Sequence, residues 1–461
     1  MMRLAPLARR LGGLALLTLL VACGEAGAPD DQPQRRTPAD IALPAMKTFP
    51  PMRAAPPQRG NDTIARDFLA LEFQMESGRE VPRLTRFEGP VTVAMTGPVP
   101  PTAPADLAAL LARLRAEAGI DIHESSGATA SITVEFIPRR RLQSIVPEAA
   151  CFVVPGVSSF GEYRGARRSD RVDWVKLERR ERAAIFIPSD TSPQEVRDCL
   201  HEELAQALGP LNDLYELSDS VFNDDNFHTI LTGFDMLVLR AHYAPELANG
   251  MSRSEVAARL PAVLSRLHPA GGQSGIAPPT PTPRSWISAI ERALGPNGSA
   301  AGRRVAAAQA VEIAKAEGWR DSRMAFSWFA LGRLSMADEL ELAVMSLAEA
   351  MRLYTTLPDA QIHISHIDMQ MAAFALSAGH PEQALELTNR AIPATRRAQN
   401  AALLASLLMI RAEAFQMLGQ PAEAQALRLD SLGWARYGFG EEVKVRQRMA
   451  EIAVLAPTTG G

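Results

Sequence analysis

The pattern of apolar and polar residues divides the chain into a mixed region and a later region that is almost wholly helical. Short apolar runs predict β-strands over 91–95, 132–136 and 183–187. The last run is nearly all apolar, so we expect this strand in the interior of its sheet. Helical spacing predicts one helix from 62, capped by Asp62, and another over 105–118. Residues 61–268 are therefore predicted to form an α+β domain with a small mixed sheet.

A further helix is predicted by signals at both of its ends. Ser192 is a suitable N-cap, Pro193 suits the first helical position, and Glu195 at the third position completes a capping box. We expect this helix to run to Leu208. Gly209 then fits a left-handed C-cap.

Residues 284–461 form an Ala- and Leu-rich helical region in which a short motif repeats. The letters GHPEQA at 379–384 recur as GQPAEA at 419–424, with a looser copy near 336. These stretches resemble the turns of tetratricopeptide (TPR) helix hairpins. Because one hairpin cannot bury its apolar face alone, neighbours must stack, and stacked repeats commonly bind peptides. We therefore expect a protein or peptide partner at the repeats; the alternative is a plain helical bundle without a binding role.

The first residues have the pattern of a removable signal. Three arginines, Arg3, Arg9 and Arg10, precede an apolar run over 11–21. This run is too short to span a bilayer. The letters LVAC ending at Cys23 resemble the bacterial lipobox, in which the cysteine is acylated and the chain is cut before it. This predicts a signal peptide over 1–22 and a lipid anchor, of palmitate type, on Cys23. The alternative is an ordinary secretory signal.

The lipobox resemblance also implies a location. A lipid-anchored protein of this kind would lie in the cell envelope on the periplasmic side, with the membrane as one partner. Gly24 follows the cysteine where some inner-membrane lipoproteins have an aspartate, which favours the outer membrane.

Two composition features narrow the picture further. The chain has three cysteines, so Cys151 and Cys199 remain once Cys23 is acylated. In an oxidising compartment these two predict a disulfide, and the alternative is a pair of buried free thiols. The formal net charge of -4 provides no footprint for nucleic acid.

Two stretches rich in proline, glycine and polar residues divide the chain. Residues 23–60 lack apolar periodicity and are predicted to be a tether, and 269–283 are predicted to be a linker. The chain is therefore predicted to consist of five parts: a signal peptide (1–22), a tether (23–60), an α/β domain (61–268), a linker (269–283) and a helical repeat domain (284–461).

The predicted helix from 193 ends in the motif EELAQALGPLND at 202–213. It resembles the metzincin pattern H-E-x-x-H-x-x-G-x-x-H/D, with Glu203 at the general-base position. Glu202, Gln206 and Asn212 then occupy the three metal-ligand positions, and both histidines are missing. The Met-turn position has Phe222, and residues 232–243 resemble the closing helix. Residues 183–250 also resemble a bacterial family of unknown function, number 2927, from which no activity follows.

This departure from the metzincin pattern bears on chemistry. Carboxamide oxygens are weak ligands for zinc, which prefers imidazole and thiolate, so the domain is predicted to be catalytically altered and no cofactor is predicted. Zinc and calcium are alternatives. Calcium would suit oxygen donors from Glu202, Asn212 and Asp213, with Asp224 or Asp225. Histidines outside the motif could complete a metal site: His201, His228 or His242.

Glu203 leaves two further interpretations open. Its position relative to Cys199 and Leu200 turns it toward the interior, where desolvation raises the pKa of a carboxyl group and creates a possible general base. It can equally be a buried structural acid bonded to Gln206 or Asn212. The leading hypothesis is an envelope-anchored binding or assembly protein. The alternatives are an atypical hydrolase that uses Glu203 as general base, and a purely structural tether.

Overall fold

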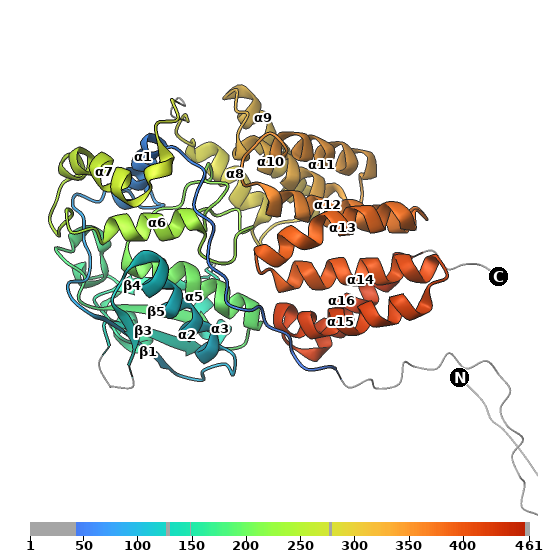
Figure 1. Cartoon of the computed structure of the whole chain (residues 1–461), viewed down its shortest axis with the longest axis horizontal. Coiled ribbons are helices and arrows are strands. Elements are labelled where there is room, and N and C mark those ends of the chain that lie inside the picture. The colour runs from blue at the N-terminus through green and yellow to red at the C-terminus, as the bar shows by residue number, and fades with distance from the viewer. Residues whose placement is uncertain (1–42, 126–129, 148, 276–278, 457–461) are drawn as a thin grey trace, which may run out of the picture. The chain divides into compact units, whose positions relative to one another are not determined.

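The computed structural model describes residues 43–125, 130–147, 149–275 and 279–456 (Figure 1). The predicted signal peptide and the lipidation site Cys23 lie outside these residues, as does the first part of the predicted tether. Among the described residues, no helix is both long enough and apolar enough to cross a membrane.

The α/β region is built on a five-stranded sheet of order β2-β1-β3-β5-β4. Its strands are β1 (Val91–Thr96), β2 (Ile122–Glu124), β3 (Ile132–Ile137), β4 (Phe152–Pro155) and β5 (Ala183–Pro188). The three predicted strands are confirmed, and β5 is fully buried with a neighbour on each side. The sheet is mixed, as predicted, because β4 is antiparallel to β5. The other three pairings of the described strands are parallel, so the region is α/β rather than α+β.

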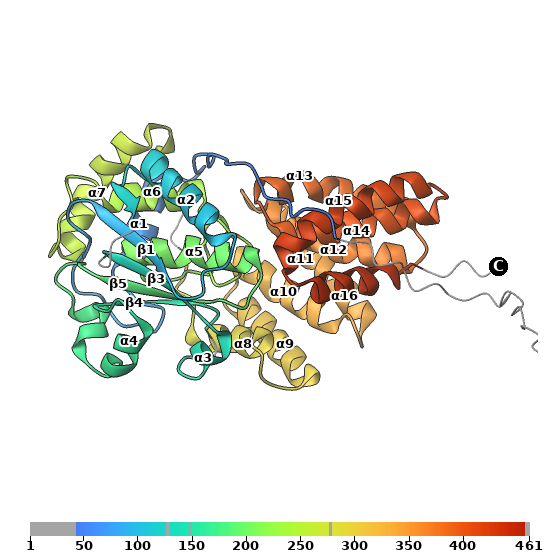
Figure 2. The same ribbon diagram turned by 90° about the horizontal axis from the view of Figure 1, so that it is seen from below.

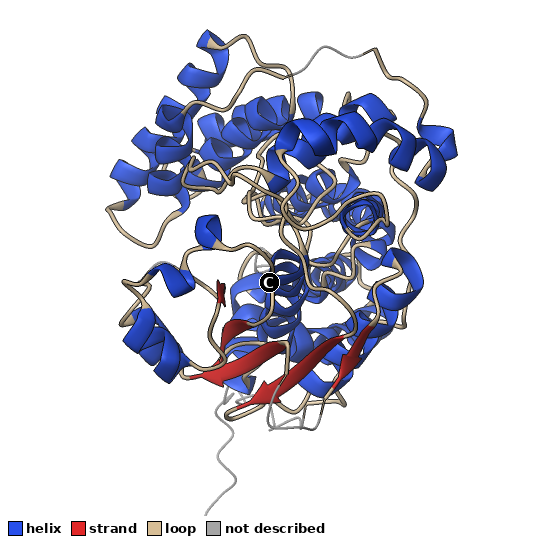
Figure 3. Ribbon diagram, turned by 90° about the vertical axis from the view of Figure 1, so that its left-hand side faces the viewer, coloured by secondary structure: helices blue, strands red, loops and turns tan. Residues whose placement is uncertain are grey.

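Helices cover both faces of this sheet. They are α1 (Asn61–Glu72), α2 (Ala103–Arg113), α3 (Arg139–Gln143), α4 (Phe160–Ala166), α5 (Pro193–Leu208), α6 (Gly233–His242) and α7 (Arg253–Leu267). Figure 2 shows α3 and α4 on one side of the strands and α1, α2, α6 and α7 on the other. The side chains of β5 alternate accordingly: Ile185 joins the larger core with α5, and Phe186 joins the smaller one with Phe160 of α4. Figure 3 shows the strands lying side by side between these helices.

The helix predicted over 105–118 consists of α2 and a π-helical turn, Leu114–Ala118. Two predicted helix caps also differ from the structure. Asp62 does not cap α1, whose N-cap is Gly60; the Asp62 carboxylate instead accepts hydrogen bonds from Ser274 and Gly275. Gly209 is the C-cap of α5 but has a φ of -151°, outside the left-handed region. Arg180 provides the cap instead, because its guanidinium donates to the carbonyls of Gln206 and Ala207, each at 2.7 Å, and to that of Gly209.

The start of α5 forms largely as predicted. The Ser192 hydroxyl accepts the N–H of Glu195 at 3.2 Å, and Pro193 occupies the first turn. The reciprocal half of the capping box is replaced by other contacts, since the Glu195 carboxylate accepts from Arg139 and Thr191.

The second region consists of paired, stacked helices (Figure 1). They are α8 (Arg284–Leu294), α9 (Ala300–Ala316), α10 (Ser322–Ser335), α11 (Leu340–Tyr354), α12 (Gln361–Ser377), α13 (Pro381–Arg397), α14 (Ala401–Met417), α15 (Pro421–Phe439) and α16 (Glu442–Ala453). Each helix packs against the next in the chain. The prediction of an all-helical second half is therefore confirmed for the described residues.

The repeated motif forms the turns of two helix pairs. Gly379 and Gly419 have φ values of 78° and 71°, a left-handed conformation that glycine adopts without strain. A proline then begins the following helix at each site. Ala384 and Ala424, at matching places in α13 and α15, are fully buried. The small residue at this position therefore lets the two helices of a pair approach closely.

Residues 43–60 contain no helix or strand and lie along both regions. Phe49 packs on Trp434 of α15 with ring centroids 4.5 Å apart, and Arg59 forms ion pairs with Asp67 and Asp219. The role of 23–60 as a whole stays a prediction.

Candidate functional site

A disulfide joins the sheet to α5. Cys151 immediately precedes β4 and bonds to Cys199 in α5, closing a loop with a sequence separation of 48. The predicted pairing is confirmed. The bond holds the start of the edge strand next to the helix that contains Glu202 and Glu203.

A pocket of about 710 Å³ opens between β4 and the second half of α5. Five carboxylate residues line it, and we call it the acidic pocket: Glu76, Glu202, Glu203, Asp213 and Asp224. Gln206 and all four residues of β4 line it as well. Glu202 and Gln206, which are at positions i and i+4 of α5, therefore line the same pocket as the edge strand β4.

Glu203 is the most buried of these carboxylates. It is 5 % exposed, and its Oε2 has no hydrogen-bond partner among the described residues. Burial, with repulsion from Glu202 and Glu76, raises its pKa well above the usual range. The two amides considered as partners are engaged elsewhere: Gln206 donates to Asp213 at 3.4 Å and Asn212 donates to the carbonyl of Ala70 at 3.1 Å.

The neighbouring carboxylates repel one another. Burial and the charges of Asp224 and Glu76 raise the pKa of Glu202 to about 8. The same causes raise the pKa of Asp213 well above its usual range, and burial with repulsion from Glu76 raises that of Asp224 to about 6. The pocket therefore concentrates acidic groups at a cost in free energy that a bound cation would lower.

The three residues at the ligand positions of the metzincin pattern do not all line one pocket. Glu202 and Gln206 line the acidic pocket, whereas Asn212 is buried against α1 and does not line it; Asp213 does so instead. Across the described residues, no three His, Cys, Asp or Glu residues converge to hold a metal ion. One carboxylate and one amide at i and i+4 do not fit a zinc site.

The three candidate histidines have structural hydrogen bonds. His201 accepts the N–H of Leu231 at 3.1 Å, and His242 pairs with Glu72 at 2.7 Å in the core. His228 bonds through Nε2 to the carbonyl of Ser218 at 3.0 Å. None of the three lines the acidic pocket.

A second pocket, of about 790 Å³, adjoins the first on the side of the helical region, and we call it the helical-side pocket. Its walls come from α5 and from helices α12, α14 and α16. Cys151, Glu202 and Asn226 line both pockets. The two pockets therefore meet beside the disulfide and Glu202.

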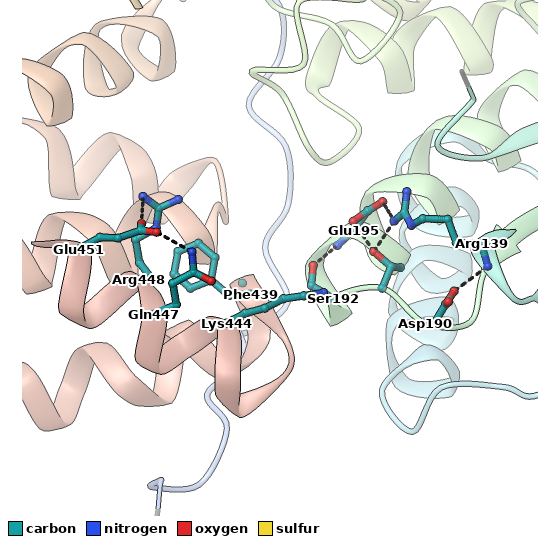
Figure 4. A pocket seen from close by; sticks show the side chains of 11 residues that line it. Arg139, Asp190, Ser192, Glu195, Phe439, Lys444, Gln447, Arg448 and Glu451 are labelled. Carbon is teal, nitrogen blue, oxygen red and sulfur yellow. Dashed lines mark hydrogen bonds and ion pairs between the residues drawn. The ribbon is translucent and has the colours of Figure 1, made fainter. Parts of the chain in front are cut away.

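A third pocket, of about 440 Å³, lies at the start of α5 beside α16 (Figure 4). Four of its charged groups form two ion pairs: Glu195 with Arg139, and Glu451 with Arg448 at 3.1 Å. Gln447 also donates to Glu451 at 2.8 Å. Because these four groups already have partners, the acidic pocket beside β4 is the stronger candidate for a ligand site.

Two parts of the site were not predicted. Glu76 follows α1, far in sequence from the motif, and has no local signal that links it to Glu202. Strand β4 has only four residues and ends at Pro155, so no alternation marks it. The cysteine pair was the one available signal, since it joins residue 151 to α5.

One comparison with known protein families finds a match, and it covers the α/β region. Residues 61–262 match a family model described as a protein of unknown function (DUF2927), and these residues form a DUF2927 domain that extends from α1 into α7. Neither the curated proteins nor the solved structures contain a match to the chain.

Proposed function

We propose that this chain is a lipid-anchored binding protein of the bacterial cell envelope that captures an extended segment of a partner protein between β4 and α5. The observation that carries the proposal is that the edge strand β4 and helix α5 line one pocket. A sheet edge with free backbone groups beside a pocket is the arrangement that binds peptides by β-augmentation.

The ladder geometry identifies the backbone groups available for pairing. Gly156 donates to the carbonyl of Arg182 at 2.8 Å, and Val154 and Phe152 pair opposite Ala184 and Phe186 in the same register. Because hydrogen-bonded positions alternate in an antiparallel pair, the N–H and C=O of Val153 point away from β5. An incoming strand would bond to Val153.

The helical region extends this binding surface. Apolar residues of the helical-side pocket include Met369, Leu403 and Ile410. A segment leaving β4 past Glu202 would enter this second pocket, since the two pockets share Cys151 and Asn226. In this proposal, the TPR-like helices bind the partner through the surface that faces α5.

The α/β region is, in this proposal, a metzincin-like domain that has lost its zinc. The mixed sheet, the helix with Glu203 and the closing helix α6 support the relationship. The donors at the ligand positions support binding rather than cleavage, because carboxamides are weak zinc ligands and those of Gln206 and Asn212 bond to Asp213 and Ala70. The lipobox at Cys23 supports the envelope location, with the outer membrane favoured.

The test uses full-length protein purified in detergent and a capped, fluorescein-labelled heptapeptide of alternating valine and threonine with a central arginine. Val153→Pro removes the edge N–H and should weaken binding at least tenfold in fluorescence anisotropy. Val153→Ala keeps that N–H and should bind within about threefold of the parent. Equal affinity for the Pro and Ala variants, or no binding to the parent protein, would refute β-augmentation.

A second candidate is a hydrolase with Glu203 as general base. The unpartnered Oε2 and raised pKa of Glu203 favour it, since a general base needs a free lone pair and a raised pKa makes the carboxylate a stronger base. Incubation of the same heptapeptide with the protein, followed by mass spectrometry, distinguishes the two. Cleavage that disappears in Glu203→Gln would establish hydrolysis, and an intact peptide supports binding.

A further inference from the structure

We propose that the acidic pocket receives the basic side chain of a lysine or arginine from the segment that pairs with β4. This inference rests on the proposed function and names the chemistry of its ligand. The partner segment is therefore expected to contain a lysine or arginine at a position that pairs with β4.

The charge of the pocket is one-sided. Five carboxylate residues line it, and the one cation among its described lining residues is Arg167, which is exposed. The charges that act on Glu203 belong to Glu202 and Glu76, and both are negative. The ion pairs of the described residues leave these three carboxylates out. By contrast, the buried acids Asp67 and Glu72 are paired with Arg59 and His242.

An independent observation is an unsatisfied oxygen of Glu203, a residue that lines the pocket. Glu203 is nine-tenths buried, and its Oε2 lacks a hydrogen-bond partner within the described part of the chain. A buried carboxyl oxygen without a hydrogen-bond partner is costly, and a cation beside it favours the ionised form, so such an oxygen in a pocket indicates a missing cationic donor. An ammonium group offers three N–H donors and a guanidinium offers five, and both offer positive charge.

The pocket suits an organic cation better than a metal ion. Its volume of about 710 Å³ accommodates a long side chain, and the carboxylates do not converge as three metal ligands. The walls beside them are apolar or aromatic, from Val153, Leu211 and Trp174. Apolar walls with charge at the far end match the methylene stem and charged head of lysine or arginine.

Strand geometry brings such a side chain to the pocket. Successive side chains of a strand point to opposite faces of the sheet, so alternate residues of a segment paired with β4 face α5. The side chain of Val153 already packs toward the core that contains α5, which identifies that face. Every second side chain of the bound segment would therefore point toward the acidic pocket.

The experiment compares three labelled heptapeptides that differ at the central residue: arginine, its neutral near-isostere citrulline, and glutamate. With full-length protein in low salt at pH 8, we expect the arginine peptide to bind at least tenfold more tightly than the citrulline peptide, with glutamate weakest. Glu203→Gln and Glu76→Gln should each reduce the preference for arginine over citrulline several-fold, because each removes one negative charge from the pocket. Glu178→Gln is the matched control, since that carboxylate is exposed and does not line the pocket.

The outcomes separate the two proposals. Equal binding of arginine and citrulline peptides, both lost in Val153→Pro, would overturn the cationic ligand and leave the peptide-binding function standing. No binding of any peptide would overturn both. A calorimetric titration with calcium chloride alone tests the alternative of a metal site. Stoichiometric calcium binding that disappears in Glu202→Gln would overturn the inference in favour of such a site. Because Glu76 is exposed, Glu76→Gln keeps the test valid if Glu203→Gln fails to fold.

Discussion

The side chain of Gln194 bonds to that of Asn400, with Nε2 donating to Oδ1 at 3.2 Å. Gln194 lies in the first turn of α5, and Asn400 is the N-cap of α14. The Oε1 of Gln194 also accepts the N–H of Ala402 at 2.9 Å. One buried amide therefore fixes the helix of the acidic pocket to the helical region.

Replacement of Gln194 by alanine should destabilise the protein, because it leaves the Ala402 N–H and the Asn400 side chain without this partner. We expect a loss of about 1 to 3 kcal/mol in the free energy of unfolding, the usual cost of an unsatisfied buried polar group. Urea unfolding followed by circular dichroism measures it. An unchanged midpoint in Gln194→Ala, judged against the exposed control Glu178→Gln, would show that this bond does not couple the two regions.

Arg180 should be essential for the position of the acidic pocket. It is 4 % exposed, and its guanidinium holds the last carbonyls of α5. Arg180→Ala should cost at least about 3 kcal/mol, since several buried carbonyls lose a charged donor. Arg180→Lys should recover part of the loss, because an ammonium group reaches fewer of these carbonyls at once. Thermal unfolding of the two variants tests this order, and an alanine variant as stable as the lysine variant contradicts it.

Stability should fall as pH rises between about 4 and 8, through the acidic pocket. The folded pKa values of Glu202, about 8, and Asp224, about 6, lie above those of unfolded carboxyl groups, near 4. The folded protein therefore holds protons that the unfolded chain has released, and the stabilisation present at low pH disappears through this window. Urea midpoints from pH 5 to 8 should fall less steeply for Glu202→Gln than for the parent protein. Parallel profiles would contradict the raised pKa of Glu202.

The lipid anchor is tested on Cys23. Cys23→Ser removes the thiol that would be acylated, so we expect the protein to lose its labelling by an alkyne analogue of palmitate and to leave the membrane fraction. Cys151→Ser is the matched control, because it removes a cysteine that the lipobox does not contain and should keep the label. Label retained in Cys23→Ser would exclude acylation at this residue.

Several features of the fold followed from local signals. Ser192 and Pro193 marked the start of α5 because N-caps and first-turn prolines depend on a few adjacent residues. The repeated glycines at 379 and 419 marked helix turns for the same reason. The disulfide followed from the number of cysteines and the expected compartment.

Other features depend on residues distant in sequence and could not be predicted in this way. The C-terminus of α5 is capped by Arg180, more than twenty residues upstream, so Gly209 did not need the left-handed conformation. Glu76 joins Glu202 only through the packing of α1 against the core. Strand β4 is short and depends on β5 and the disulfide for its position, so its sequence pattern alone is too weak to identify it.

The central claim, that a peptide strand pairs with the free edge of β4 above the acidic pocket, is tested most directly by amide hydrogen exchange. Full-length protein is compared with and without the arginine-centred heptapeptide, and exchange is followed in fragments that cover 151–156 and α5. We predict that the amide of Val153 becomes at least tenfold slower to exchange when the peptide is bound. Unchanged exchange at Val153 with a saturating amount of bound peptide would contradict the account.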